Sequence, residues 1–593
     1  MRQTPLRGPG SFSVWAPDAS TMDIVVDGDQ KALQRDDQAD GWWHLEPALD
    51  YDSPLNYGYL VDGQGPYPDP RSLRQPSGVH GLSQTFDTGA YAWSDHSWTG
   101  RSVAGAIIYE LHIGTFTPEG NLDAAIGRLE HLRSIGVDFV ELLPVNAFNG
   151  VHNWGYDGVL WYAVHEPYGG PEGYQRFVDA CHASGIGVIQ DVVYNHLGPS
   201  GNYLPKFGPY LRGDEANTWG SALNLDGPDS DEVRHYIIDN VMLWLHDFHV
   251  DGLRLDAVHA LVDQRAMSTL EELSTEVERA STSQGRPFTL IAESDRNDPK
   301  TIMSREAGGI GIDAQWSDDF HHALHVALTG ETSGYYADFA GLQALKKTLT
   351  QGFFHDGSYS TFRRRHHGRP IHTLTTPTSR LIVFSQDHDQ VGNRAAGDRL
   401  ARTLSDGQLA IAATLTLLGP YTPMLFMGQE WAASTPWQFF TSHPEPDLGK
   451  ATADGRIAEF ARMAWDSSVV PDPQDPETFR RSILDWSERA GGRHARILEL
   501  YQKLAQLRSG RPDITDPDFS AVSVEVDEDD RWLVLIRANT TVAVNFSATP
   551  VLVPNLDTVA PLLVFGGYRD SEDGTFLDGH SVLVLDTERR EQP

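Results

Sequence analysis

The chain has little of what several protein classes depend on. One cysteine, Cys181, stands among 593 residues, so no intrachain disulfide can form. No run of about 20 apolar residues exists, so the sequence predicts no membrane-spanning helix. Residues 1–10 carry no apolar stretch like that of a signal peptide, and a cytoplasmic location is the expectation.

Positive charge is also scarce. There are 46 Lys and Arg against 82 Asp and Glu, which gives a net charge of −36. Such a surface repels polyanions, so nucleic acid and anionic membranes are not expected as partners. The charge identifies no partner by itself, because a highly soluble surface explains it equally well. The 40% hydrophobic fraction and the 15 Trp fit a globular chain with a large core.

The pattern of the chain changes twice along its length, and the chain is too long for one hydrophobic core. Short alternating runs such as Met22-Asp-Ile-Val-Val26, separated by turn residues, predict a β-sandwich over 1–97. Short apolar strands then alternate with helical segments over 98–510. After residue 510 strand patterns return, as in Thr541-Val-Ala-Val-Asn545, and predict a C-terminal β-sandwich over 511–593.

The middle region predicts a (β/α)8 TIM barrel with insertions. Its strand candidates are 106–113, 138–143, 187–193, 252–257, 288–293, 313–317, 381–385 and 423–427. Its clearest helical runs are 122–135, 173–184 and 231–246, and a further helix at 493–508 closes the barrel. One long connection at about 196–230, after the third strand, should form a lobe over the pocket. The predicted fold class is therefore multidomain α/β, a central barrel flanked by two β-sandwiches.

Three carboxylates follow predicted barrel strands. Asp256 follows the fourth strand, Glu293 the fifth and Asp389 the seventh. Because the carboxyl ends of barrel strands meet at one face, these distant acids should share one pocket. Two carboxylates with separate roles are the minimum for glycoside hydrolysis, and a third can stabilise a cationic sugar transition state. The three acids therefore predict a candidate glycosidase site.

A buried cation is expected beside these acids. Asp191 lies inside the apolar third strand, where an unpaired carboxylate is costly. Arg254 precedes Asp256 by two residues, so both side chains point the same way from a strand. A guanidinium there can pair with both carboxylates and keep Asp256 ionised. The alternative is a buried structural ion pair without a catalytic role.

Four motifs together resemble the four sequence regions of the α-amylase superfamily of retaining glycosidases. They are Asp191-Val-Val-Tyr-Asn-His196, Gly252-Leu-Arg-Leu-Asp256, Glu293 and His388-Asp389. The resemblance implies that Asp256 is the nucleophile, Glu293 the general acid/base and Asp389 the transition-state stabiliser. It also implies substrate-binding or positioning roles around the cleavage subsite for Tyr156, Asp191, His196, Arg254 and His388.

Two positions depart from that family pattern. Asp387 stands where the fourth region usually has Asn. A carboxylate there either shifts the titration of the site or points away from it, and pointing away is the expectation. His259 stands three residues after Asp256, where α-amylases often have Lys. We place His259 among the substrate-binding residues, with the leaving-group subsites left open.

A narrower resemblance, to the trehalose-releasing hydrolases of this superfamily, rests on longer runs. They are Asn153-Trp-Gly-Tyr-Asp-Gly158, Phe207-Gly-Pro-Tyr210, Trp316-Ser-Asp-Asp-Phe-His-His322, Phe426-Met-Gly-Gln-Glu-Trp431 and Gln438-Phe-Phe440. The resemblance implies retaining hydrolysis of the α-1,4 bond next to the terminal trehalose of maltooligosyltrehalose. No cofactor is expected, and no metal, because no set of carboxylates in the sequence demands one. Other α-1,4-glucan oligosaccharides would also bind, and a maltooligosyltrehalose synthase is the implied partner enzyme. The alternative is a glycogen branching or debranching enzyme with the same acids.

The same resemblance identifies the N-terminal sandwich as an immunoglobulin-like, carbohydrate-associated module. The insertion offers six side chains that suit the trehalose end: Tyr203, Phe207, Tyr210, Asn217, Trp219 and Asn224. For Trp219 the alternative is packing of the insertion against the barrel. His321, His322 and His325 have metal-like spacing on a helix, although ordinary packing is the expectation.

Overall fold

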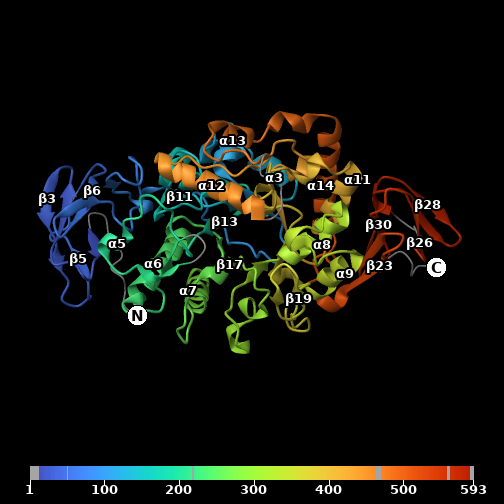
Figure 1. The fold of residues 1–593 in the computed structure, drawn as a ribbon, viewed down its shortest axis with the longest axis horizontal. Coiled ribbons are helices and arrows are strands. Elements are labelled where there is room, and N and C mark those ends of the chain that lie inside the picture. The colour runs from blue at the N-terminus through green and yellow to red at the C-terminus, as the bar shows by residue number, and fades with distance from the viewer. Residues whose placement is uncertain (1–11, 50, 217–219, 463–468, 557–560, 588–593) are drawn as a thin grey trace.

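The structure is a computed structural model that describes residues 12–587 except 50, 217–219, 463–468 and 557–560. The molecule is elongated, with the N-terminal sheets at one end, the barrel in the middle and the C-terminal sheets at the other end (Figure 1). Among the helices of these residues, none is long and apolar enough to cross a membrane.

Two small antiparallel sheets form the N-terminal region. One has the order β1 (Ser13–Trp15), β5 (Trp42–His44), β4 (Gln34–Arg35). The other has the order β3 (Asp29–Ala32), β2 (Met22–Val26), β6 (Asn56–Val61), β7 (Gln64–Tyr67), with β8 (Ser83–Gln84) also on β6. Along β2 the side chains of Met22, Ile24 and Val26 are buried and those between them are half-buried, as a strand with one core face requires.

A closed barrel of eight parallel strands forms the centre. In chain order the strands are β9 (Ile108–Leu111), β10 (Phe139–Leu142), β13 (Gly187–Val192), β16 (Gly252–Leu255), β17 (Thr289–Ala292), β18 (Ala314–Trp316), β21 (Leu381–Val383) and β22 (Thr422–Phe426). All eight predicted strands are confirmed. An apolar layer that includes Ile108, Phe139, Ile189 and Ile382 fills the inside of the barrel, so the barrel is a packed core.

Helices surround the barrel. They include α4 (Gly170–Ala183), α6 (Ser230–Met242), α7 (Thr269–Gln284), α8 (Asp318–Thr329), α9 (Leu342–Gln351), α10 (His388–Gly392), α11 (Asp406–Leu417), α12 (Pro446–Arg462), α13 (Pro476–Arg481) and α14 (Gly492–Gly510). The helix predicted at 122–135 is in fact two, α2 (Leu122–Ile126) and α3 (Leu129–Ser134). The break falls at Gly127, because glycine weakens a helix interior.

The C-terminal region contains two antiparallel sheets. The larger has the order β23 (Val522–Asp527), β24 (Trp532–Arg537), β25 (Thr540–Asn545), β30 (Ser581–Asp586), β27 (Pro561–Phe565). The smaller has the order β26 (Val551–Pro554), β29 (Gly574–Leu577), β28 (Tyr568–Ser571). The predicted fold class is thereby confirmed, while the boundaries at 97/98 and 510/511 stay predictions.

Candidate active site

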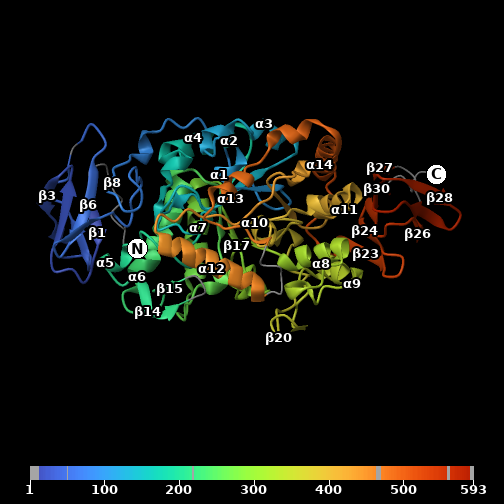
Figure 2. The same cartoon turned by 45° about the horizontal axis from the view of Figure 1, so that its top comes forward.

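The carboxyl ends of the barrel strands open into a cavity of about 500 Å³. It is lined by Asn153, Trp154, Tyr156, Asp157, His196, Asp256, Ala257, His259, Glu293, Asp295, His388, Asp389, Asn393, Phe439, Thr452, Gly455 and Arg456. The three predicted acids therefore do share one pocket. The helix α12, which supplies the last three residues, passes over the barrel (Figure 2).

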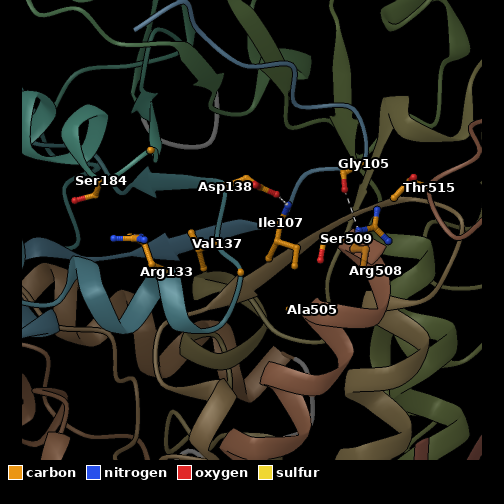
Figure 3. A pocket seen from close by; sticks show the side chains of 12 residues that line it. Gly105, Ile107, Arg133, Val137, Asp138, Ser184, Ala505, Arg508, Ser509 and Thr515 are labelled. Carbon is orange, nitrogen blue, oxygen red and sulfur yellow. Dashed lines mark hydrogen bonds between the residues drawn. The ribbon is translucent and has the colours of Figure 1, made fainter. Parts of the chain in front are cut away.

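A second cavity, of about 280 Å³, lies at the opposite end of the barrel, beside residues that precede the first strands (Figure 3). Arg508 of α14 donates from Nε to the Gly105 carbonyl at 2.9 Å and from Nη2 to the Tyr421 carbonyl at 2.7 Å. Asp138 accepts from the Ile107 amide at 2.9 Å and from Arg101 at 2.6 Å. These hydrogen bonds join α14 to the starts of the barrel strands, which is a structural role. The candidate site is therefore the first cavity, where the three predicted acids lie.

Arg254, on β16, is fully buried and binds three carboxylates. Its Nη1 donates to both oxygens of Asp191, at 2.9 and 2.8 Å, and to Oδ1 of Asp256 at 2.7 Å. Its Nη2 donates to Oε2 of Glu293 at 2.9 Å. The Trp316 ring centroid lies 4.3 Å from the guanidinium carbon. The predicted pairing of Arg254 with Asp191 and Asp256 is confirmed, and it extends to Glu293.

Asp256 is kept ionised by its neighbours. Burial disfavours its charged form, but the Arg254 charge and a hydrogen bond from Asn195 outweigh burial and lower the pKa of Asp256. The Asn195 amide donates to Asp256 Oδ2 at 2.6 Å and to the Asp256 carbonyl at 2.9 Å. An ionised carboxylate at the cavity wall is the state that a nucleophile needs.

Glu293 has the opposite ionisation tendency. Burial and the charges of Asp256 and Asp389 raise the pKa of Glu293 to about 8. The charge of Arg254 lowers this pKa but only partly offsets the rise. The backbone N–H of Ala257 also donates to Glu293 Oε2, at 2.8 Å. Glu293 is therefore protonated at neutral pH and can donate a proton, as a general acid must.

His388 and Tyr156 form a stacked pair at the cavity floor. Their rings lie 5.2 Å apart at 19°. The Tyr156 hydroxyl donates to Asp191 Oδ2 at 2.7 Å and lies 2.9 Å from Nε2 of His388. Nδ1 of His388 lies 2.5 Å from Oε1 of Glu110. Burial alone would lower the pKa of His388, but Asp389 and Glu110 raise it to about 10, so the imidazolium donates from both nitrogens.

The other predicted residues of the α-amylase motifs also lie at the cavity. His196 is buried, its ring is hydrogen-bonded to Asn195 Oδ1, and burial lowers its pKa. Asp389 is the most exposed of the three acids, with 40% of its side chain accessible, and accepts from Asn393 at 3.0 Å. His259 lines the cavity, and its Nδ1 has no hydrogen-bond partner among the described residues.

Asp387 caps a helix and does not line the cavity. Its carboxyl group accepts from the Gln390 backbone N–H at 2.6 Å, at the start of α10. Burial and the nearby charge of Glu110 raise the pKa of Asp387 well above its usual range. The cap oxygen of Asp387 is one that the expected Asn would also offer, and the absence of Asp387 from the cavity lining agrees with the prediction that it points away.

Two of the aromatic residues predicted as sugar platforms in the insertion after β13 are packed inside the protein. Phe207 and Tyr210 are buried, and they pack edge-on against Tyr59 and Trp15 of the N-terminal sheets, at 6.2 and 5.2 Å between ring centroids. That prediction is wrong for these two aromatics, because the sequence does not show that the insertion packs against the sandwich.

Other insertion residues have structural partners or lie outside the described part. The Tyr203 ring packs on Tyr67 at 5.3 Å, and its hydroxyl bonds His80 at 2.8 Å. The Asn224 amide donates to the backbone carbonyls of Pro209 and Pro228. Asn217 and Trp219 lie outside the described residues.

The three helix histidines pack within the protein. His321 Nδ1 lies 3.0 Å from the Ser385 carbonyl, and His325 Nε2 lies 2.9 Å from Glu331. The His325 ring stacks on Tyr336 at 4.3 Å. Within the described ranges no three His, Cys, Asp or Glu side chains are grouped to hold a metal ion.

Sequence reasoning missed two residues of the site. Glu110 holds His388 in place by hydrogen bonds. The sequence did contain a signal for Glu110, because it is a carboxylate within the apolar run of β9, as Asp191 is within β13. Arg456 of α12 lines the cavity, donates to Asn393 Oδ1 at 2.9 Å and lies over the Phe439 ring at 4.8 Å. No motif marked it, because its place depends on how α12 folds back over the barrel.

Known proteins resemble the chain over nearly its whole length. Residues 82–209 match the family model for the alpha amylase catalytic domain, and residues 517–584 match a domain of unknown function, DUF3459. The chain is 58% identical to malto-oligosyltrehalose trehalohydrolase of Rhizobium sp. (strain M-11), over 98% of this chain and 96% of the relative. It is 60% identical to the Arthrobacter ramosus protein of that name, over 97% and 99% of the two chains. A solved structure, a putative alpha amylase from Salmonella typhimurium, matches with a TM-score of 0.88 and 35% identity, over 97% of each chain.

These similarities first establish the class of protein. The barrel and the catalytic-domain match make the chain a glycoside hydrolase of the α-amylase superfamily. At 58% and 60% identity over almost the full length, it belongs to the family of malto-oligosyltrehalose trehalohydrolases. Both resemblances read from the sequence are thereby confirmed.

Proposed function

We propose that the chain hydrolyses the α-1,4-glucosidic bond next to the terminal trehalose of maltooligosyltrehalose, releasing trehalose and a maltooligosaccharide. The observation that carries the chemistry is that Asp256 and Glu293 bind neighbouring nitrogens of one guanidinium. Their pKa values are shifted in opposite directions, that of Asp256 down and that of Glu293 up. Two carboxyl groups bound by one guanidinium favour the short separation of retaining glycosidases over the wider separation of inverting ones.

In the first step of this mechanism, Glu293 donates its proton to the glycosidic oxygen and Asp256 attacks the anomeric carbon. The bond to the leaving trehalose breaks and a glycosyl–Asp256 ester forms. Asp389 stabilises the positive charge that develops on the sugar ring, and His196, Tyr156 and His388 hold the ring above the acids.

In the second step, the Glu293 carboxylate takes a proton from water as that water attacks the glycosyl ester. The maltooligosaccharide leaves with its anomeric configuration retained, and Glu293 is protonated again. Arg254 acts as a positioning residue for Asp256, and Asp191 fixes Arg254 and Tyr156.

A branching or debranching activity is less well supported, because the full-length relatives at 58% and 60% identity carry the trehalohydrolase name. Incubation with maltopentaose and with its trehalose-terminated analogue, followed by chromatography, tests the proposal. Free trehalose from the second substrate supports it. Random internal cleavage of both substrates at similar efficiency contradicts it and leaves the superfamily assignment intact.

Two further points stay part of this proposal. A maltooligosyltrehalose synthase is the enzyme that would supply the substrate, and a coupled assay starting from maltopentaose tests that partnership. The cytoplasmic location expected from the sequence is tested by cell fractionation.

A further inference from the structure

Asp389 is the most exposed acid of the catalytic cavity, and its carboxylate depends on one neighbouring amide. Asn393 Nδ2 donates to Asp389 Oδ1 at 3.0 Å, and within the described part of the chain no other hydrogen bond reaches this carboxylate. His388 Nε2 lies farther from the same oxygen, at 3.6 Å. Because 40% of the Asp389 side chain is accessible, packing alone does not fix its direction, and the bond from Asn393 does so.

Arg456 determines which end of the Asn393 amide faces Asp389. Its Nη1 donates to Asn393 Oδ1 at 2.9 Å. A guanidinium has donors only, so it binds the oxygen end of an amide and leaves the NH2 end for the carboxylate. In the reversed orientation, the amide oxygen would face the Asp389 carboxylate and the NH2 group would face the cation. Arg456 therefore keeps Asn393 in the orientation in which it donates to Asp389.

Arg456 also holds the end of the helix that carries Asp389. Its Nη2 donates at 2.7 Å to the carbonyl of Gly392, the last residue of α10. The last carbonyls of a helix have no partner inside that helix. With five residues, α10 is too short to be stable without such support. Asp387 caps its start and Arg456 its end, so both ends of α10 are fixed.

The guanidinium of Arg456 is itself held in place. It lies over the Phe439 ring, 4.8 Å from the centroid. The helix that bears it, α12, passes over the catalytic end of the barrel (Figure 2). Glu445, just before α12, accepts from Asn149 Nδ2 at 2.9 Å and from the Ser200 hydroxyl at 2.5 Å. An anchored helix therefore presents the cation to α10.

We propose that Arg456 is a positioning residue of the reaction, which acts on the transition state through Asn393 and Asp389. The inference rests on the proposed function, because it takes Asp389 as the group that stabilises the charged sugar ring. A carboxylate turned away from that ring stabilises the transition state less, since the electrostatic effect depends on groups fixed in place beforehand.

The first test separates positioning from direct contact with the substrate. For Arg456→Gln we expect kcat on trehalose-terminated maltopentaose to fall about tenfold, the effect of one lost hydrogen bond to a charged group. KM should stay within about twofold, because the stabilisation by Asp389 grows as charge develops on the sugar. Arg456→Lys keeps the charge but not the two-pronged geometry, so its kcat should lie between those of wild type and Arg456→Gln.

A double-variant cycle tests whether Arg456 acts through Asn393. Asn393→Ala alone should lower kcat by about tenfold or more, because Asp389 loses its donor. If the two residues act in one chain, Arg456→Gln added to Asn393→Ala should lower kcat by less than about threefold further. Independent effects would instead multiply to about a hundredfold.

Lys450→Gln is the matched control. Lys450 is a cation of the same helix that pairs with Asp454 on the surface and does not line the cavity. Its loss should leave kcat and KM within about twofold, and the melting temperatures of all variants show whether α12 still packs on the barrel.

Two results would overturn the inference. One is a rise in KM for Arg456→Gln with kcat unchanged, which would mean direct binding of the substrate. The other is a double variant whose loss equals the product of the single losses. A wild type that cleaves maltopentaose but releases no trehalose from the trehalose-terminated analogue refutes the proposed function instead, and the same cycle on maltopentaose then decides the role of Arg456.

Discussion

Two fully enclosed arginines lie at opposite ends of the same barrel. Arg254, at the catalytic end, binds the carboxylates of Asp191, Asp256 and Glu293, and these acids raise its pKa well above the usual range despite burial. Arg508, at the other end, binds only backbone carbonyls among the residues that the structure describes, and burial lowers its pKa to about 9. The same side chain therefore serves two different purposes.

The difference shows what partners do to a buried charge. Carbonyl dipoles satisfy the donors of Arg508 and join α14 to the barrel, but they bring no second titrating group to that end of the barrel. Carboxylates around Arg254 compete for one positive charge, so their pKa values separate: that of Asp256 falls, while burial raises those of Glu293 to about 8 and Asp191 to about 6. A split of this kind supports the proposed roles of Asp256 as nucleophile and Glu293 as acid.

Removing either acid at the catalytic end should have the largest effect. Asp256→Ala or Glu293→Gln should lower turnover by several orders of magnitude, because each removes a group that forms or breaks a bond. Steady-state kinetics on the trehalose-terminated substrate measure the loss, and circular dichroism checks that the fold is intact. Retention of more than roughly a tenth of wild-type turnover would refute the assigned role.

Substituting each arginine tests the comparison directly. Arg254→Leu should lower turnover by about a hundredfold or more, because Asp256 loses the cation that orients it and keeps it ionised. Arg508→Leu should leave turnover within about twofold but lower the free energy of unfolding by about 3 kcal/mol or more, since it leaves several buried carbonyls unsatisfied. Kinetics and denaturant unfolding of both variants provide the measurements. Equal kinetic losses at the two ends would contradict the division of roles.

The pH profile should report the split between the acids. Catalysis needs Asp256 ionised, which holds above its lowered pKa, and Glu293 protonated, which holds below about 8. The value of kcat/KM should therefore fall about tenfold per unit as the pH rises beyond about 8. An alkaline limb starting near pH 4–5, the range of an ordinary glutamic acid, would show that Glu293 is not the shifted acid.

Much of this site could be predicted from the sequence, because each of its signals lies within one strand or just after it. Eight apolar runs predicted the barrel strands, and acids just after them had to meet at one face. The pairing of Arg254 with Asp256 followed from two-residue spacing on a strand. The reasoning applied to Asp191 would also have found Glu110, because it is a carboxylate inside an apolar strand.

The rest depended on contacts between distant segments. The sequence marked the insertion as aromatic, but it could not show that Phe207 meets Tyr59 of the N-terminal sheets rather than a sugar. Arg456 belongs to the site only because α12 returns over the barrel. Asp318 and Asp319 are neighbours in the sequence, and only the structure shows that Asn297 and the backbone at 354–355 donate hydrogen bonds to Asp319.

Phe207 tests whether every residue near the catalytic end has a catalytic role, because it belongs to an insertion at that end but packs within the protein. Phe207→Ala should lower the free energy of unfolding by about 3–5 kcal/mol, the usual cost of deleting a buried ring. The KM for the trehalose-terminated substrate should stay within about twofold. A large rise in KM without loss of stability would restore the insertion ring as a substrate platform.

Asp387 should give the smallest effect, although it lies two residues from Asp389. Its carboxyl group is buried, and burial together with the charge of Glu110 raises its pKa well above the usual range, which favours the neutral form. Asn has nearly the same shape, is neutral at every pH, and offers the same oxygen to the Gln390 backbone N–H at the start of α10. Asp387→Asn should therefore change turnover by less than about twofold and leave both limbs of the pH profile in place. If the variant instead moves the alkaline limb, Asp387 is ionised and takes part in the coupled titration of the catalytic acids. In that case the charge of a helix-capping residue outside the cavity would influence the pKa of Glu293. The residues that control catalysis would then include some that do not line the cavity.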